Sequence, residues 1–356
     1  MGIQGPVTVC YKLVSGIPIL LDVYLPPLQA TQRDVKEVLL PFIIYFHAGG
    51  LSVGNKKSYF PTWLHNRVIS LGYGFISADY QLLPPATAHD IIKDIQDAFS
   101  FITGNLLEDQ NTRIKGDPDR LVVAGSSAGG LCAYLAALHA SPKPKALLSI
   151  YGMGGNFFSP HYLVPKKEVF FRGREILDPE EFTDFLYPYK GGTPTTIVDS
   201  PPAYHPPTYH IPGYPANRRM LLPRLYLQLG VFLDYYTGMH QPSISKVLRE
   251  ILDKGETEGN ANGFKQAIPE IHQTVIPQIM VDGNWPATML LHGTADTAVP
   301  IEESRHLRGL LDAAGVPVDF IEFNGKEHSF DYETDAEEVW KEQFDMVKAF
   351  LYKSLG

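Results

Sequence analysis

Short apolar segments alternate with amphipathic segments along much of the chain, and this alternation predicts a fold of strands and helices. Segment 38–46 is almost continuously apolar, as expected of a strand buried on both faces. The predicted strands are 7–13, 18–25, 38–46, 74–80, 121–123, 146–151, 287–291 and 318–323. The predicted helices between and after them are 61–71, 90–101, 300–314 and 336–351. The fold class is therefore α/β, with a mostly parallel, doubly wound sheet covered by helices on both faces.

The alternation stops after residue 151 and resumes only at residue 287. Prolines and aromatic residues crowd the segment between these points, and two helix signals remain in it. One is the capped start at 178–181, and the other is the helical spacing at 244–252. We therefore predict a core of residues 1–151 and 287–356, with residues 152–286 inserted as a mainly helical cap or lid.

Composition and charge narrow the class of protein. Hydrophobic residues make up 44% of the 356 residues and charged residues 19%, which is ordinary for a globular protein. The formal net charge of −9 argues against nucleic acid or an anionic membrane surface as a partner. The two cysteines, Cys10 and Cys132, form neither a disulfide framework nor a metal cluster. With no signal-peptide pattern and no apolar stretch of about twenty residues, we expect a cytoplasmic protein without a membrane span. The oligomeric state stays open, a homodimer included.

A strand–turn–helix motif carries the first chemical signal. Gly125-Ser126-Ser127-Ala128-Gly129 matches G-x-S-x-G between the apolar strand at 121–123 and an alanine-rich helical segment. Glycines two residues to either side of Ser127 let the backbone make a tight, strained turn. The turn lifts the Ser127 hydroxyl to a helix N-terminus, which favours developing negative charge. Ser127 is thus the predicted nucleophile, whereas Ser126 points elsewhere and makes local hydrogen bonds.

A serine nucleophile needs a base and a group that orients the base. Asp296 follows the strand at 287–291, and His328 follows the last strand. Ser127, Asp296 and His328 therefore occur in the order Ser…Asp…His, each beyond the carboxyl end of a strand. Three other acids are rivals for this role. Asp282 lies within the insertion, and Glu327 and Asp331 lie too close to His328 in sequence to come from a separate strand end.

Small residues after the strand at 38–46 suggest an oxyanion hole. His47-Ala48-Gly49-Gly50 resembles the HGGG loop of lipases and esterases, whose backbone N–H groups bind the oxyanion. We predict Ala48, Gly49 and Ala128 as the donors, with Gly50 as an alternative. The segment 79–82 is predicted to brace this loop.

These motifs together resemble the α/β-hydrolase superfamily, and within it the hormone-sensitive-lipase-like esterases. The HGGG, DYRLAP and GDSAGG motifs of those esterases correspond to residues 47–50, 79–84 and 125–130. Residues 292–300 with His328 also resemble the prolyl-oligopeptidase and dienelactone-hydrolase side of the superfamily. The chain departs in reading HAGG and GSSAGG and in carrying its cap as an insertion. The resemblance implies an α/β-hydrolase fold and hydrolysis of an ester, thioester, lactone or amide through an acyl-enzyme, without metal or organic cofactor.

The function predicted from these signals is that of a carboxylesterase-like serine hydrolase acting on an ester or lactone of a bulky apolar substrate. Ser127 attacks, His328 acts as base and then acid, and Asp296 fixes the imidazole tautomer. The insertion contains several aromatic residues, namely Tyr204, Tyr209, Tyr214, Tyr226, Phe232 and Tyr235. Some of them line the substrate pocket, or all of them only build the cap's own core. Two alternatives remain: an acyltransferase or other biosynthetic enzyme with a non-water acceptor, and a non-catalytic ligand-binding member of the fold.

Overall fold

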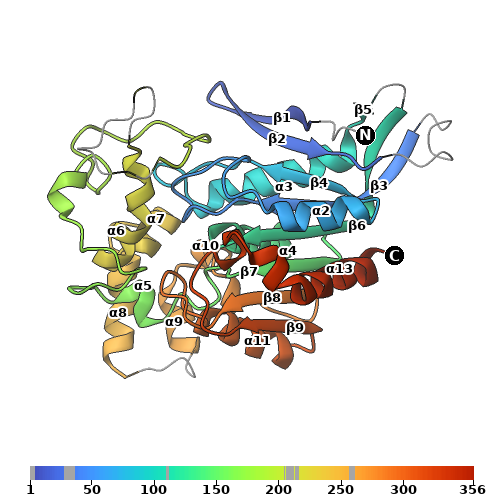
Figure 1. Ribbon diagram of the computed structural model, residues 1–356. Helices are drawn as coiled ribbons and strands as arrows, with labels where there is room; N and C mark the ends of the chain where they lie inside the picture. Colours follow the sequence, from blue (N-terminus) through green and yellow to red (C-terminus); the bar gives the residue numbers. More distant parts are fainter. Residues whose placement is uncertain are drawn as a thin grey trace.

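A single twisted sheet forms the centre of the molecule (Figure 1). The computed structural model describes residues 5–27, 37–109, 112–203, 205, 212, 216–255 and 261–356. Within these residues nine strands pair in the order β1-β2-β4-β3-β6-β7-β8-β9, and β5 pairs with β6. The strands are β1 (Val7–Val14), β2 (Ile17–Tyr24), β3 (Glu37–Phe46), β4 (Gly74–Ala78), β5 (Leu107–Asp109), β6 (Thr112–Ser126), β7 (Ala146–Ile150), β8 (Ala287–Gly293) and β9 (Val318–Phe323). The β1–β2, β2–β4 and β5–β6 pairs are antiparallel, and every other pair is parallel.

Helices cover both faces of the sheet, as the alternating pattern predicts. On one face α3 (Ala88–Gly104), α4 (Ala128–His139) and α11 (Glu302–Ala313) pack over one apolar cluster. On the other face α2 (Thr62–Ser70) and α13 (Lys341–Leu355) pack over a second cluster. The alternating side chains of β3 feed both clusters, because Ile44 belongs to the first and Ile43 to the second. The prediction of a doubly wound α/β sheet is therefore confirmed.

Some elements differ from the sequence prediction. One helix is predicted over 336–351, but the structure has α12 (Ala336–Val339) and α13, separated by Trp340 with φ −108° and ψ 21°. The start signal at 178–181 gives only a single 3₁₀ turn, η1 (Pro179–Phe182), although the Asp178 side chain accepts a hydrogen bond from Glu180 N at 3.0 Å. The short strand β5 was not predicted, because its three residues have no apolar alternation.

The segment between β7 and β8 is made of short helices joined by long loops. The helices are α5 (Pro160–Leu163), η1, η2 (Arg218–Leu221), α6 (Leu222–Leu229), α7 (Phe232–Thr237), α8 (Ile244–Asp253), α9 (Ala261–Ala267), α10 (Glu270–Gln273) and η4 (Pro277–Ile279). Figure 1 shows most of them gathered at one end of the sheet. The predicted spacing at 244–252 corresponds to α8, whose N-cap Ser243 accepts a hydrogen bond from Lys246 N. The pairing of β7 with β8 then continues the sheet as if the segment were absent.

Candidate active site

Ser127 lies on a strained turn between β6 and α4. Its φ is 54° and its ψ is −118°, a combination that non-glycine residues rarely adopt. The flanking glycines are required by close backbone contacts. A Cβ on Gly125 would lie 2.0 Å from Gly129 O, and a Cβ on Gly129 would lie 1.9 Å from Phe46 O. The glycines of the motif therefore let the turn pack against β3 and against itself.

The structure brings Ser127, His328 and Asp296 into one hydrogen-bonded row. His328 Nε2 lies 3.0 Å from Ser127 Oγ, and His328 Nδ1 lies 2.6 Å from Asp296 Oδ2. All three residues are less than a tenth exposed. His328 precedes the short turn η5 (Phe330–Tyr332), and Asp296 lies on the loop after β8. Residues from three separate strand ends thus meet with the geometry of a nucleophile, a base and an orienting acid.

Asp296 is held by more partners than the sequence suggests. Its Oδ1 accepts hydrogen bonds from Ala298 N and Val299 N, both at 2.9 Å. His292 Nε2 lies 3.3 Å from Oδ2 and also 2.8 Å from Val299 O. Burial by itself would raise the pKa of Asp296, but the attraction of His328 and the hydrogen bonds from both histidines outweigh it and lower the pKa well below its usual range. The carboxylate is therefore ionised when it faces His328.

The rival acids have other partners. Asp331 accepts hydrogen bonds from Tyr151 Oη at 2.5 Å and Trp63 Nε1 at 3.0 Å. Glu327 accepts hydrogen bonds from the backbone and hydroxyl of Thr297 and from the backbone N–H of His328. Asp282 is exposed and accepts hydrogen bonds from Asn284. None of these carboxylates accepts a hydrogen bond from the imidazole of His328 among the described residues.

The loop after β3 presents backbone donors near Ser127. Gly49 has φ 121°, and a Cβ there would lie 1.9 Å from Val53 O, so only glycine fits. Within the described residues, the N–H groups of Ala48, Gly49 and Ala128 donate to no protein acceptor. Gly50 N–H is likewise without a protein acceptor in that part of the chain. These predicted donors are thus available to an oxyanion, and the alternative, Gly50, stays open.

Tyr80 contacts this loop directly, and Asp79 holds the chain that follows it. The His47 ring stacks on Tyr80 with ring centroids 4.4 Å apart, and Tyr80 Oη donates to His47 O at 2.9 Å. Burial lowers the pKa of His47 to about 4, so the ring is neutral at pH 7. Asp79 accepts hydrogen bonds from Lys56 N at 2.5 Å and Lys56 Nζ at 3.3 Å. The segment after β4 therefore braces the loop.

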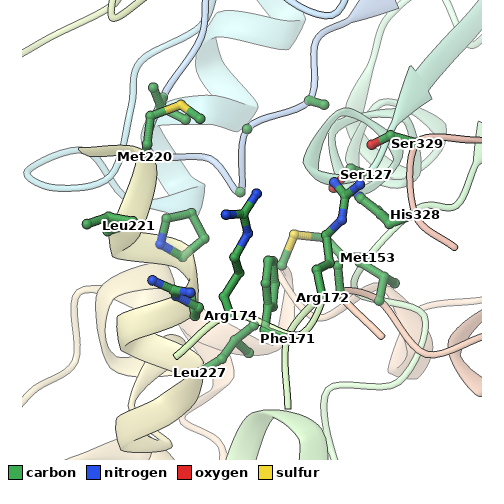
Figure 2. A pocket seen from close by; sticks show the side chains of 18 of the residues that line it. Ser127, Met153, Phe171, Arg172, Arg174, Met220, Leu221, Leu227, His328 and Ser329 are labelled. Carbon is green, nitrogen blue, oxygen red and sulfur yellow. The ribbon is translucent and has the colours of Figure 1, made fainter. Parts of the chain in front are cut away.

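A cavity of about 240 Å³ opens beside Ser127 and His328 (Figure 2). Its walls come from residues 48–59 after β3, from the segment between β7 and β8, and from the loops that carry Asp296 and His328. Apolar side chains dominate these walls, among them Val53, Met153, Phe171, Leu221, Leu227 and Phe232. Three arginines that the sequence analysis did not single out also line it, namely Arg172, Arg174 and Arg224. Nothing in the local sequence of these arginines distinguishes them from surface residues.

The aromatic residues predicted for the pocket divide into three groups. Phe232 lines the cavity. Tyr226 and Tyr235 stack on each other with ring centroids 3.8 Å apart, and their hydroxyls bond to Phe185 O and Tyr187 N, outside the cavity lining. For these two tyrosines a pocket role is wrong, because they build the core of the inserted segment. Tyr204, Tyr209 and Tyr214 lie outside the described residues.

Two features are absent from the residues that the structure describes. No cluster of three or more histidine, cysteine or acidic side chains is arranged to hold a metal ion there. No helix in this part of the chain has the length and apolar character needed to cross a bilayer.

Two family models match different parts of the chain, one on each side of residues 159–232. The family model BD-FAE matches residues 21–158, which include the 47–50 loop and Ser127. The model of the prolyl oligopeptidase family matches residues 233–355, which include Asp296 and His328. The second match agrees with the likeness to prolyl oligopeptidases expected for residues 292–300.

Individual relatives give a consistent result. Over 91% of its length the chain is 27% identical to the non-reducing polyketide synthase Preu6 of Preussia isomera, of which it spans only 14%. It is 34% identical over 35% of its length to carboxylesterase NlhH of Mycobacterium tuberculosis, covering 34% of that protein. The butyrate-bound esterase Est2 of Thermogutta terrifontis superposes with a TM-score of 0.56 at 18% identity, over 99% of this chain and 95% of that one. The likeness to solved structures shows that the chain has the α/β-hydrolase fold.

Proposed function

We propose that this protein hydrolyses a carboxylic ester or lactone through an acyl-enzyme formed on Ser127. The observation that carries the proposal is the row of hydrogen bonds from Ser127 Oγ through the His328 ring to Asp296 Oδ2. His328 Nε2 takes the hydroxyl proton as Ser127 Oγ attacks the carbonyl carbon. Asp296 keeps the proton on Nδ1, so that Nε2 is the acceptor, and it stabilises the imidazolium that forms.

The attack places negative charge on the carbonyl oxygen. We assign the N–H groups of Ala48, Gly49 and Ala128 as its donors, since each lacks a protein acceptor among the described residues. Backbone donors held by a rigid loop need no rearrangement when the charge forms, which is why such donors stabilise the transition state strongly. His328 then protonates the leaving alcohol, and a water molecule activated by the same nitrogen hydrolyses the acyl-enzyme.

Residues 152–286 act in this proposal as a cap on the core of residues 1–151 and 287–356. The cap contributes Phe171, Leu227 and Phe232 to the wall of the cavity, and this apolar wall shields the attack of Ser127 on the bound ester from bulk solvent. An apolar group of the substrate is bound there through its buried surface. Within the superfamily we place the chain near the hormone-sensitive-lipase-like esterases, on the strength of residues 47–50 and 125–130.

A second candidate function is acyl transfer or release in a biosynthetic pathway. The alignment over 91% of the chain with part of a polyketide synthase favours it. The same residues would then act on a thioester, and the acceptor would be an alcohol or amine in place of water. A non-catalytic binding role is disfavoured by the complete hydrogen-bonded row at Ser127.

The test is covalent labelling followed by turnover. We expect a fluorophosphonate probe to label the protein at Ser127 and the protein to hydrolyse p-nitrophenyl butyrate. Ser127→Ala should abolish labelling and lower kcat on the order of 10⁶-fold, with an unchanged fold. Ser126→Ala is the matched control, because the Ser126 hydroxyl bonds to Tyr45 Oη at 2.6 Å, whereas His328 Nε2 bonds to Ser127. Undiminished turnover in Ser127→Ala would refute the mechanism, and faster transfer to an added alcohol or amine than to water would favour the second candidate.

A further inference from the structure

We propose that the cavity selects substrates carrying a carboxylate, which Arg172 binds with the support of Arg174 and Arg224, at the far end of an apolar chain or ring. This inference rests on the proposed function, since it names the substrate class of the same site. It also changes the expectation of a purely apolar substrate that the aromatic content of the insertion suggests.

The first observation is the charge of the lining. Arg172, Arg174 and Arg224 line the cavity together with Ser127 and His328, and none of the described residues that line it is acidic. Arg224 is only 4% exposed, whereas Arg172 and Arg174 are exposed at the entrance. Figure 2 shows the side chains of Arg172 and Arg174 among those that line the cavity with Ser127. The formal net charge of the whole chain is −9, so the positive charge at this cavity is opposite in sign to the net charge of the protein.

The second observation is the backbone at Arg172. Arg174 N donates to Phe171 O at 2.9 Å and closes a two-residue turn in which Arg172 has φ 48° and Gly173 has φ 64°. Turns with positive φ at both central residues favour Asn-Gly, because most residues that carry a Cβ are strained there, whereas asparagine tolerates this conformation. Arginine is thus present where asparagine or glycine would fit with less strain, and such an outlier points to a task for the side chain.

The third observation is how this turn is fixed to the site. Arg172 N donates to Thr297 Oγ1 at 2.9 Å, and Thr297 Oγ1 donates to Glu327 Oε2 at 2.5 Å. The other oxygen of Glu327 accepts from His328 N at 2.7 Å. Since Thr297 follows Asp296 in the chain, the turn is joined to both loops that carry the proposed acid and base. The backbone of the turn that carries Arg172 is therefore held at a defined place relative to these loops.

The chemistry of the lining specifies the ligand. A guanidinium binds a carboxylate through two parallel hydrogen bonds, with a geometry that a lysine cannot provide. The same cavity is also lined by apolar side chains, with Met153 and Phe171 among them. A substrate that uses both features has an ester at one end, an apolar middle and a carboxylate at the other end. In the described residues no ion pair to Arg172 competes with that carboxylate.

Two matched pairs of substrates test the inference. On the acyl side, mono-p-nitrophenyl adipate is compared with p-nitrophenyl hexanoate, in which a methyl group replaces the carboxylate. On the alcohol side, 4-butanoyloxybenzoate is compared with its methyl ester. After correction for spontaneous hydrolysis, we expect kcat/KM to favour the carboxylate substrate by roughly ten- to a hundredfold in one of the pairs. The preference should decrease as salt is added, because ions screen an attraction at the cavity entrance.

Variants assign the preference to Arg172. Arg172→Asn suits the positive φ of the turn and removes the charge, so it should lower the ratio of kcat/KM within the preferred pair by roughly tenfold or more. Arg172→Lys should retain part of the ratio. The matched control is Arg308→Asn on α11, where an exposed arginine lies 3.5 Å from Asp312, and it should leave the ratio unchanged.

Failure of this inference can be told apart from failure of the proposed function. Ser127-dependent turnover of the neutral esters with no carboxylate preference in either pair would overturn the inference alone. An Arg172→Asn ratio equal to that of the unmodified protein would also overturn it. If the neutral esters are not turned over, binding of the adipate and hexanoate esters to Ser127→Ala is compared by calorimetry. Equal affinity would then overturn the inference, and tighter binding of the adipate ester would support it.

Discussion

Replacing Asp296 with asparagine tests the proposed orienting acid with the smallest change of shape. In the structure Oδ1 accepts hydrogen bonds from Ala298 N and Val299 N, and Oδ2 faces His328 Nδ1. An asparagine satisfies the two backbone donors only with its amide oxygen, so its NH₂ group points at His328. Two donors cannot face each other, and Nδ1 must then become an acceptor. The ring proton moves to Nε2, where the imidazole can no longer take the proton of Ser127.

The size of the effect follows from this tautomer change. The nucleophile, the oxyanion donors and the cavity all remain, so the loss is confined to general-base catalysis. A change of this kind lowers kcat by roughly 10⁴-fold. At 1.36 kcal/mol for each factor of ten, the loss corresponds to about 5 kcal/mol of the activation free energy.

The assay is the pH profile of kcat for p-nitrophenyl butyrate with Asp296→Asn, together with its melting temperature. The fold should persist, because the two backbone hydrogen bonds are kept. Glu327→Gln and Asp331→Asn serve as controls and should have small effects on kcat, since neither carboxylate contacts the His328 ring. Turnover close to that of the unmodified protein in Asp296→Asn would refute the assignment. A 10⁴-fold loss in Asp331→Asn alone would move the role of the acid to Asp331.

Three further predictions concern the oxyanion loop, a buried acid and the cap. Gly49→Val should lower kcat about 10²–10³-fold, because its Cβ would lie 1.9 Å from Val53 O and displace an N–H donor. Ala48→Gly should keep most of the rate. An unchanged rate in Gly49→Val would mean that the loop is purely structural. Burial raises the pKa of Glu303 to about 8, so the folded state binds more protons than the unfolded state between about pH 4.5 and pH 8. The free energy of unfolding should therefore fall as pH rises through that window, by up to about 1.4 kcal/mol per pH unit, and urea unfolding should find this slope missing in Glu303→Gln. In the unmodified protein kcat/KM should rise steeply from acetate to hexanoate esters, since each buried CH₂ contributes about 0.8 kcal/mol. Phe232→Leu should make this rise less steep. If the chain-length profile of Phe232→Leu equals that of the unmodified protein, Phe232 does not contact the substrate.

The core and the proposed catalytic residues could be predicted because their signals are local. The strands read as apolar runs since both of their faces are buried, as at β3 and β7. The glycines around Ser127 are fixed by contacts within a few residues of the turn and with the neighbouring strand. Asp296 and His328 follow strand ends, and parallel strands bring such loops to one edge of the sheet.

The structure of the segment between β7 and β8 could not be predicted in the same way, because its packing depends on contacts between distant segments. Tyr226 and Tyr235 look like pocket residues in the sequence, yet each is the other's stacking partner. The importance of Arg172 depends on a turn and on its hydrogen bond to Thr297, 125 positions away. His292 was missed for a similar reason, since its ring turns back from the end of β8 to reach Asp296 and Ser304.

The position of the insertion also affects how the chain acquires its fold. Ala146 in β7 pairs with Ala287 in β8, so closing that contact joins positions about 140 residues apart. The entropy of closing such a loop opposes pairing by about 4 kcal/mol, apart from a constant. At a synthesis rate of roughly 5–20 residues per second, β8 leaves the ribosome about 7–28 s after β7. During that interval β7, which is buried along its whole length in the finished fold, is an unpaired edge on the nascent chain. The segment made in the interval is the insertion itself, which therefore begins to fold beside an unfinished sheet, and substitutions in its aromatic core should affect the yield of folded protein as well as the shape of the cavity.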